Sequence, residues 1–174
     1  MRISLAGVPG VGKSSVARLV ASRLAIRVID INLFAHSNGL IEEYDPESDS
    51  EIIDTQKAAK MLEDEDNVVF EGHWSDDIPA DILVVLRLDP EKIIERLLKR
   101  GYKEKKAYEN ALAEALDNYQ DAQQRTKLDI DTTGLTQEQV ADKVVKAIKT
   151  RQGDDVDWSG WLEENVEKLE KLGL

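Results

Sequence analysis

The sequence predicts an α/β fold of the P-loop NTPase type, with a five-stranded parallel sheet and helices on both of its faces. Three observations predict this fold class. A glycine-rich stretch, GVPGVGKSS, directly follows a short apolar segment at the N-terminus. Apolar segments of strand length alternate with segments whose apolar residues recur at helical spacing. One of them, DILVVLRL at residues 81–88, is almost wholly apolar, as is typical of a central strand in a parallel sheet.

The glycine-rich stretch joins the first predicted strand, residues 2–6, to a helix that begins at Lys13. It fits G-x-x-x-x-G-K-[ST], with Gly7, Gly12, Lys13 and Ser14 at the fixed positions. Glycines allow backbone amides to wrap a polyphosphate, and the N-terminus of a helix favours an anion. In such loops the lysine reaches the β- and γ-phosphates and the hydroxyl binds Mg²⁺. A glycine-rich turn that binds nothing is the alternative, but the strand before and the helix after favour phosphate binding.

The later elements follow from apolar patterns and capping signals. Pro90 suits the first position of a helix, where its missing N–H costs little. Thr136 and Gln139 form a capping-box pattern at the start of the last core helix. Further strands are predicted at residues 27–31, 67–72 and 127–131, and further helices at 51–64 and around 107–119.

Two segments fit neither pattern. The acidic stretch at residues 38–50 breaks all periodicity and is expected to be a mobile insertion or a substrate-binding lobe. Residues 151–174 are charged, contain Trp158 and Trp161, and are expected to form a C-terminal tail. Because the chain has 174 residues, a single domain over residues 1–174 is predicted.

The composition narrows the classes of function. With 23 basic and 35 acidic residues the net charge is −12, which argues against direct contact with nucleic acid or an anionic membrane. Such a charge either keeps the protein soluble or attracts a basic protein. The chain has no cysteine for a disulfide and no apolar run of membrane-spanning length. Because the first strand begins at the N-terminus without a leader, a cytoplasmic protein is expected.

A phosphate loop alone does not distinguish a switch, a motor and a kinase. A GTPase needs an Asn-Lys-x-Asp motif to read the base, and the chain has no Asn-Lys pair. The segment Asp131–Gly134 fits the D-x-x-G switch pattern, but it follows the fifth strand and is interpreted as a chance match. A transporter ATPase needs a far larger domain. The small size, the insertion after the second strand and the arginines after the fourth favour a phosphotransferase, which aligns two substrates and neutralises charge.

Those arginines are Arg96 and Arg100, four residues apart near the end of a predicted helix and beside a basic segment at residues 99–106. Their spacing places them on one side of the helix, where they can close over phosphates. A solvated basic face balanced by nearby glutamates is the alternative. The functional interpretation is favoured for Arg100, and for Arg96 both remain open.

Four stretches of the chain resemble the nuclear and archaeal adenylate kinase family known as adenylate kinase isoenzyme six. They are GVPGVGKSS, EGHWSDDIPADILVVLR, ERLLKRGYKEKKAYENALAEAL and the VDWS near the C-terminus. They occur in one order over nearly the whole chain, and the archaeal branch is the most similar.

The resemblance implies a fold of the nucleoside monophosphate kinase type and a broad-specificity nucleoside monophosphate kinase with ATPase activity, using ATP and Mg²⁺. It also implies a role in late maturation of the small ribosomal subunit and its 16S rRNA. That role would involve transient contact with the basic ribosomal protein uS-eleven. The rival interpretation is an ATP-gated assembly factor that binds this ribosomal protein and has little kinase activity.

The resemblance also assigns site residues. It implies a monophosphate-binding lobe at roughly residues 28–51 and a lid at roughly residues 99–109, from which Arg100 contacts ATP. The ATP phosphates are expected to bind Gly10, Gly12, Lys13, Ser14 and Ser15.

Three further residues are assigned on weaker grounds. Glu71 stands where these ATPases carry the carboxylate that organises Mg²⁺ and its waters. His73 follows the third strand and is expected to orient water or acceptor in the crevice, or else to pack beside Trp74. His36 stands where many adenylate kinases hold the acceptor phosphate with an arginine, and Leu33 stands where the family has an acidic residue. A histidine near its unperturbed pKa of about 6.5 is a weak anchor, so low acceptor affinity is expected; the alternative for His36 is a surface position on a helix.

Overall fold

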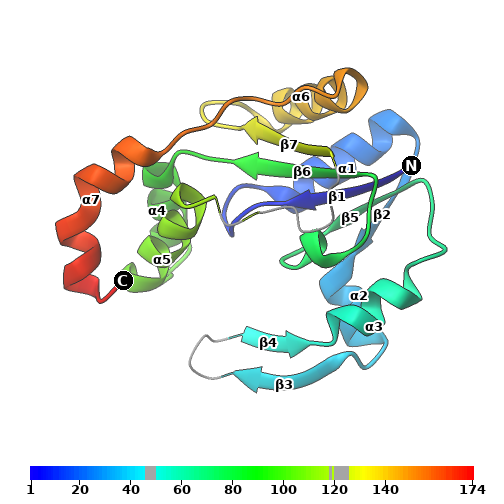
Figure 1. The fold of residues 1–174 in the computed structure, drawn as a ribbon, viewed down its shortest axis with the longest axis horizontal. Helices are drawn as coiled ribbons and strands as arrows, with labels where there is room; N and C mark the ends of the chain where they lie inside the picture. Colours follow the sequence, from blue (N-terminus) through cyan, green and yellow to red (C-terminus); the bar gives the residue numbers. More distant parts are fainter. Residues whose placement is uncertain (46–49, 118, 120–125) are drawn as a thin grey trace.

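Five parallel strands form the central sheet of the protein, in the order β2–β5–β1–β6–β7 (Figure 1). The computed structural model describes residues 1–45, 50–117, 119 and 126–174. The strands are β1 (Arg2–Ala6), β2 (Arg27–Asp30), β5 (Val68–Glu71), β6 (Ile82–Arg87) and β7 (Thr126–Asp131). All four pairings between neighbouring strands are parallel, which confirms the predicted sheet.

The centre of the sheet is buried on both faces. Every residue of β6 is buried, as are those of β5, and β1 lies hydrogen-bonded between the two. Strands that are covered on both sides cannot alternate polar and apolar residues, which explains the continuous apolar pattern at residues 81–88.

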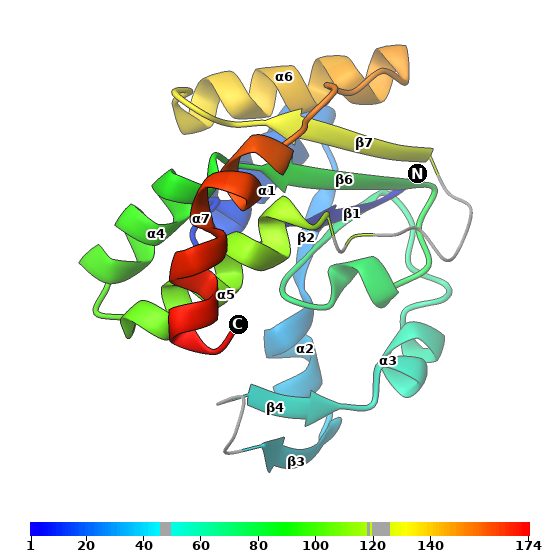
Figure 2. The same ribbon diagram turned by 60° about the vertical axis from the view of Figure 1, so that its left-hand side comes forward.

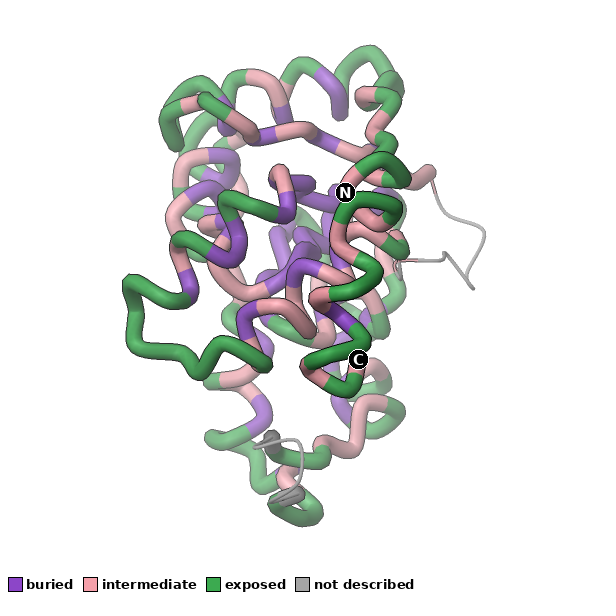
Figure 3. Tube along the Cα trace, turned by 90° about the vertical axis from the view of Figure 1, so that its left-hand side faces the viewer, coloured by how far each residue is buried: buried purple, intermediate pink, exposed green. Residues whose placement is uncertain are grey.

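One face of the sheet is covered by α1 (Lys13–Leu24) and α6 (Gln137–Thr150), which pack side by side. Their apolar residues join those of the strands in the largest hydrophobic core cluster. The predicted capping box is present at the start of α6: the side chain of Thr136 accepts from the Gln139 amide, and the Gln139 side chain accepts from the Thr136 amide. Figure 3 shows the buried residues gathered in the middle of the molecule.

The other face is covered by smaller elements. The helices α2 (Ile31–Ser37) and α3 (Thr55–Met61) pack around Phe70 and Ile78 in a separate cluster, beside the short 3-10 helix η1 (Ser75–Asp77). Towards β6, Tyr119 packs on a small cluster of buried apolar residues, Ala6, Leu83 and Val85.

A pair of contacting helices, α4 (Pro90–Lys99) and α5 (Glu104–Ala115), lies towards the carboxyl ends of the strands (Figures 1 and 2). The last helix, α7 (Ser159–Leu172), lies against α5. None of the helices in the described part of the chain is long and apolar enough to cross a membrane.

Three parts of the fold differ from the sequence-based predictions. The acidic stretch contains an antiparallel hairpin of β3 (Ile41–Asp45) and β4 (Ser50–Ile53), whose connecting residues 46–49 lie outside the described residues. The predicted helix at 51–64 is wrong at its start, because β4 occupies that position and Asp54 caps α3 by accepting from the Lys57 amide. The predicted tail contains the 14-residue helix α7.

Candidate functional site

The phosphate-binding loop lies between the end of β1 and the start of α1, as its sequence predicts. Its three glycines Gly7, Gly10 and Gly12 all have positive φ, at 141°, 96° and 100°. At Gly7 a Cβ would also lie 2.7 Å from the Leu86 carbonyl oxygen of the neighbouring strand β6. The glycine is therefore required both for the backbone conformation and for the close approach of β6.

Lys13 folds back over this loop. Its Nζ donates hydrogen bonds to the carbonyl oxygens of Gly7, at 2.6 Å, and Val8, at 3.2 Å. Burial lowers the pKa of Lys13 to about 8, although Glu71 and Asp76 oppose this shift. The ammonium group is thus held beside the backbone that surrounds the expected phosphate position.

A hydroxyl and a carboxylate meet at the start of α1. The Ser14 hydroxyl donates to Glu71 Oε2 at 3.1 Å, because the end of β5 lies directly beside the end of β1. Burial raises the pKa of Glu71, and the nearby carboxylate of Asp30 on β2 raises it further, while the bond from Ser14 lowers it.

This pair fits Mg²⁺ better than a metal that needs a full protein cage. In the described part of the chain, no group of three His, Cys, Asp or Glu side chains could hold a metal ion. Mg²⁺ is commonly bound by one or two protein oxygens, with waters and substrate phosphates as the other ligands. In the described part of the chain the buried Glu71 carboxylate forms no ion pair, although Lys13 and Arg18 are near enough to lower its pKa.

An open crevice of ≈ 300 Å³ lies on the β2 and β5 side of the loop. Lys13, Ser14 and Ser15 line it from α1, and Glu71 and His73 from the end of β5. The pKa of His73 is lowered, first by partial desolvation and then by the charge of Lys13, although the residue remains exposed. Both effects favour the neutral imidazole, which is able to accept a hydrogen bond. The remaining lining residues include Asp30, Asn32, Arg100 and Tyr102.

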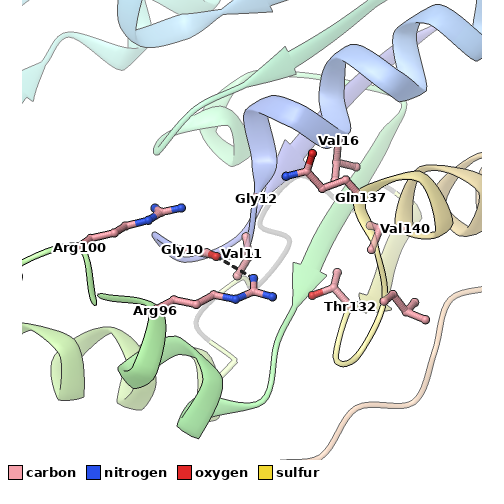
Figure 4. Close-up of a pocket in the computed structure, with 10 residues that line it drawn as sticks. Gly10, Val11, Gly12, Val16, Arg96, Arg100, Thr132, Gln137 and Val140 are labelled. Atoms are coloured by element: carbon pink, nitrogen blue, oxygen red, sulfur yellow. Dashed lines mark hydrogen bonds between the residues drawn. The ribbon is translucent and has the colours of Figure 1, made fainter. Parts of the chain in front are cut away.

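A second pocket of ≈ 290 Å³ lies on the other side of the loop, between α4 and the start of α6 (Figure 4). Arg96 reaches across it and donates from Nη1 to the Gly10 carbonyl oxygen at 3.0 Å. Arg100 lines both this pocket and the first crevice. The far wall combines apolar and polar side chains, from Thr132, Leu135, Gln137 and Val140.

The structure brings nearly all the predicted site residues together around the loop. Those that line one or both cavities are Gly10, Gly12, Lys13, Ser14, Ser15, Glu71, His73, Arg96 and Arg100. His36 is the exception: it lies exposed on α2, with Nε2 3.0 Å from Glu51 Oε2 of β4, and does not line either cavity. Its predicted contact with the acceptor phosphate is not supported by this position.

Sequence reasoning missed two groups of lining residues, Asp30 with Asn32 and the segment from Thr132 to Val140. Asp30 is the last residue of β2 and Asn32 follows it, and Thr132 directly follows β7, so both groups lie at the carboxyl edge of the parallel sheet. Ligands bind at this edge in open α/β sheets, so their position after a predicted strand was the available signal. Thr132 belongs to the D-x-x-G match, and its hydroxyl donates to the Arg87 carbonyl oxygen at 2.8 Å.

Comparison with solved structures identifies the same fold in several small kinases. A shikimate kinase from Acinetobacter baumannii, solved in complex with shikimate, aligns with a TM-score of 0.64 at 18% identity, covering 86% of this chain and 93% of that one. A deoxyadenosine kinase from M. mycoides aligns with a TM-score of 0.60 at 16% identity, covering 86% and 99%. The fold is therefore the P-loop α/β fold of nucleoside monophosphate kinase type.

Comparison of sequences adds the family. Residues 3–117 match the family model described as an AAA domain. A protein of Methanocaldococcus jannaschii named "Putative adenylate kinase" is 39% identical over 165 residues, covering 91% of this chain and 93% of that protein. A Pyrococcus furiosus protein of the same name is 36% identical over 187 residues, covering 99% of both. The chain belongs to this adenylate kinase-like family of archaeal P-loop proteins.

Proposed function

We propose that the protein is a broad-specificity nucleoside monophosphate kinase that transfers the γ-phosphoryl group of ATP to an AMP-like acceptor and also hydrolyses ATP. The observation that carries this proposal is the pair of cavities that meet at the phosphate loop, with Arg100 lining both. A phosphotransferase needs two substrate sites that share one phosphoryl group. The names of the archaeal relatives agree with this reaction class.

The donor nucleotide occupies the pocket between α4 and α6. Its base lies against the wall formed by Leu135, Gln137 and Val140, and its phosphates follow the loop towards Lys13. The loop amides and Lys13 bind the β- and γ-phosphates, while Arg96 and Arg100 neutralise charge from the opposite side. Ser14 and Glu71 would hold Mg²⁺, which would offset the charge of the phosphates.

The acceptor occupies the crevice on the β2 side, near Asn32 and Tyr102. His73 is neutral there and orients either the acceptor or a water molecule towards the γ-phosphate. Because this crevice is open in the structure, water reaches the same position when no acceptor is bound. That accounts for ATPase activity beside kinase activity.

The proposal also includes the two segments that surround these sites, a lobe and a lid. We place a monophosphate-binding lobe at roughly residues 28–51, of which 46–49 lie outside the described residues. The lid covers roughly residues 99–109 and carries Arg100. The whole chain acts as one domain, at work in the cytoplasm.

The test is the formation of ADP from ATP and Mg²⁺, with and without AMP. We expect AMP to increase ADP formation well above the rate of ATP hydrolysis alone, and CMP or dAMP to act as further acceptors. Lys13→Ala is expected to abolish turnover and weaken ATP binding without unfolding the protein. If no monophosphate increases ADP formation, the kinase proposal is wrong.

A second candidate is an ATP-gated assembly factor with little kinase activity, acting in ribosome biogenesis and rRNA processing. Two observations support it: the net charge of −12, and the engagement of His36 with Glu51 away from the crevice. The partner would be a basic small-subunit ribosomal protein, uS-eleven, bound transiently. A pull-down with purified small-subunit proteins tests it, because this complex must weaken as salt is added.

A further inference from the structure

The segment that leads into α7 is attached to the body of the protein at the edge of the sheet. The Asp154 amide donates to the Asp129 carbonyl oxygen of β7 at 2.8 Å, and Asp154 Oδ2 accepts from the Asp131 amide at 2.7 Å. Lys143 of α6 forms an ion pair with the same carboxylate at 2.8 Å. The start of the C-terminal segment is therefore fixed before it crosses to α5 (Figure 2).

The first anchor on the far side is Trp158. Its indole N–H donates to Glu114 Oε1 at 3.1 Å, near the end of α5. Glu114 is fully buried, and the same oxygen accepts from Arg87 Nε at 2.7 Å and from the Leu88 amide at 3.3 Å. Trp158 is thus joined, through one carboxylate, to the segment between β6 and α4.

Two further contacts hold the starts of α4 and α5. Trp161 donates its indole N–H to Glu91 Oε1 at 2.6 Å, in the first turn of α4. Lys168 pairs with Glu104 at 2.7 Å, in the first turn of α5, and lies over the ring of Tyr108 at 5.3 Å. Hydrogen bonds to a charged partner are the stronger kind, so all three contacts restrain the helices that they join.

These two helices carry the arginines of the donor site. Arg96 lies five residues after Glu91, and Arg100 lies four residues before Glu104. Arg100 follows α4 in the turn towards α5. Trp158, Trp161 and Lys168 contact the start of α4 and both ends of α5.

We propose that α7 is a positioning element for the donor site, which sets Arg96 and Arg100 against the phosphate loop through Trp158, Trp161 and Lys168. The inference rests on the proposed function, in that the two arginines bind ATP. It assigns a purpose to a helix that lines neither cavity in the described part of the chain.

The test measures binding of Mg²⁺ and a non-hydrolysable ATP analogue by titration calorimetry. Trp158→Phe/Trp161→Phe keeps two aromatic rings and removes both indole donors, and Glu114 retains Arg87 and Leu88 as partners. We expect the Kd for the analogue to rise roughly three- to tenfold, as for other couplings that act through packed elements. The Kd for AMP should rise less, because Arg96 lines only the donor pocket and Arg100 alone also lines the acceptor crevice. Glu91→Gln, which still offers an oxygen to Trp161, should bind nearly as the unaltered protein does, whereas Glu91→Ala should not.

Controls separate positioning from general stability. Glu164→Ala, at an exposed position on α7, should change neither Kd. The tryptophan changes should add nothing in an Arg96→Ala/Arg100→Ala background, because the effect is carried by those arginines. Equal losses in both backgrounds, or an unchanged Kd for the analogue, overturn the inference while leaving the proposed function standing. If the unaltered protein binds no ATP analogue, the proposed function fails and the inference with it.

Discussion

At the scale of single residues, the burial of Lys13 changes the pH range over which this residue carries its charge. The loop lowers the pKa of Lys13 to about 8, mainly by desolvation. In the protein without nucleotide, the ammonium therefore loses its proton as the pH rises through 8, whereas bound phosphates favour the charged form.

The first prediction follows from the direction of this pKa shift. The affinity for ATP should be nearly constant below pH 7 and should fall above pH 8, by up to about tenfold for each pH unit. Titration calorimetry between pH 6.5 and 9.5 checks it, together with proton uptake measured in buffers of different ionisation enthalpy. A flat affinity across this range would show that the charge of Lys13 does not contribute to binding.

Arg100 carries the second prediction. A guanidinium that meets phosphate oxygens in a closed site forms charge-assisted bonds at their strongest, so Arg100→Ala should lower kcat by a factor on the order of 10³. Arg100→Lys should recover little, because a point charge does not reproduce the planar fork. The melting temperature should hardly move, since an exposed charge at a helix end contributes under about 1 kcal/mol. Lys99→Ala is the matched control, and near-normal turnover with a lower melting temperature would make Arg100 structural.

Among single residues, the sequence predicts best those positions that a required backbone conformation restricts to one residue type. The loop residues were predictable because only glycine adopts the dihedral angles of Gly7 and Gly12, and a motif fixes their spacing. The direction in which His36 points was not, since a seven-residue helix offers no apolar stripe long enough to orient it.

At the scale of elements, α5 is tied to the sheet by one buried ion pair. Arg87 at the end of β6 is 2% exposed and Glu114 is fully buried, with 2.7 Å between Arg87 Nε and Glu114 Oε1. Arg87 also reaches Asp129 of β7 at 3.0 Å, so one guanidinium joins two strands and a helix.

The third prediction concerns this pair. Glu114→Ala leaves the buried Arg87 with only part of its compensation, so the free energy of unfolding should fall by about 3 kcal/mol. Urea denaturation followed by circular dichroism measures it. Glu95→Ala removes one partner of an exposed pair with Lys92 and should lower the free energy of unfolding far less. Equal effects of the two changes would mean that burial adds nothing to the role of Glu114.

Elements were predictable from sequence where a regular apolar face meets the core. That holds for the five strands and for α1, α4 and α6, which bury their apolar residues together. Among the described strands, β3 and β4 pair only with each other and leave Tyr44 and Ile52 exposed, so their sequence shows no clean alternation. Helix α7 buries only Leu169, and its attachment depends on indole and ammonium groups that periodicity does not reveal.

At the scale of the whole molecule, the strand order decides which side chains can meet. Because β5 and β6 flank β1, residues from three distant parts of the chain reach the phosphate loop. Strand–helix alternation predicts such a parallel sheet from the sequence. The alternation does not predict which loops face each other across the sheet. The structure was therefore needed to identify Leu135, Gln137 and Val140 as one wall of the donor pocket.

The fourth prediction belongs to this scale. A ligand that binds only the folded state stabilises it by mass action, by about 2.7 kcal/mol at a hundredfold excess over Kd. ATP with Mg²⁺ should therefore raise the melting temperature of the protein in a concentration-dependent way, and ATP with a chelator should raise it less. Lys13→Ala should show neither shift. A shift of equal size in that variant would place ATP outside the phosphate loop.

The positions of the tryptophans allow their fluorescence to report on movements of the protein. The chain has three, and Trp158 and Trp161 both lie at the start of α7 with their indole N–H groups bonded to carboxylates. The third, Trp74, directly follows His73 at the edge of the crevice. Indole emission responds to local polarity and to nearby charge, so any displacement of α4 or α5 during turnover changes the fluorescence of the first two residues. With Trp74 replaced by Phe, stopped-flow fluorescence would follow the donor side of the molecule alone, without any attached dye.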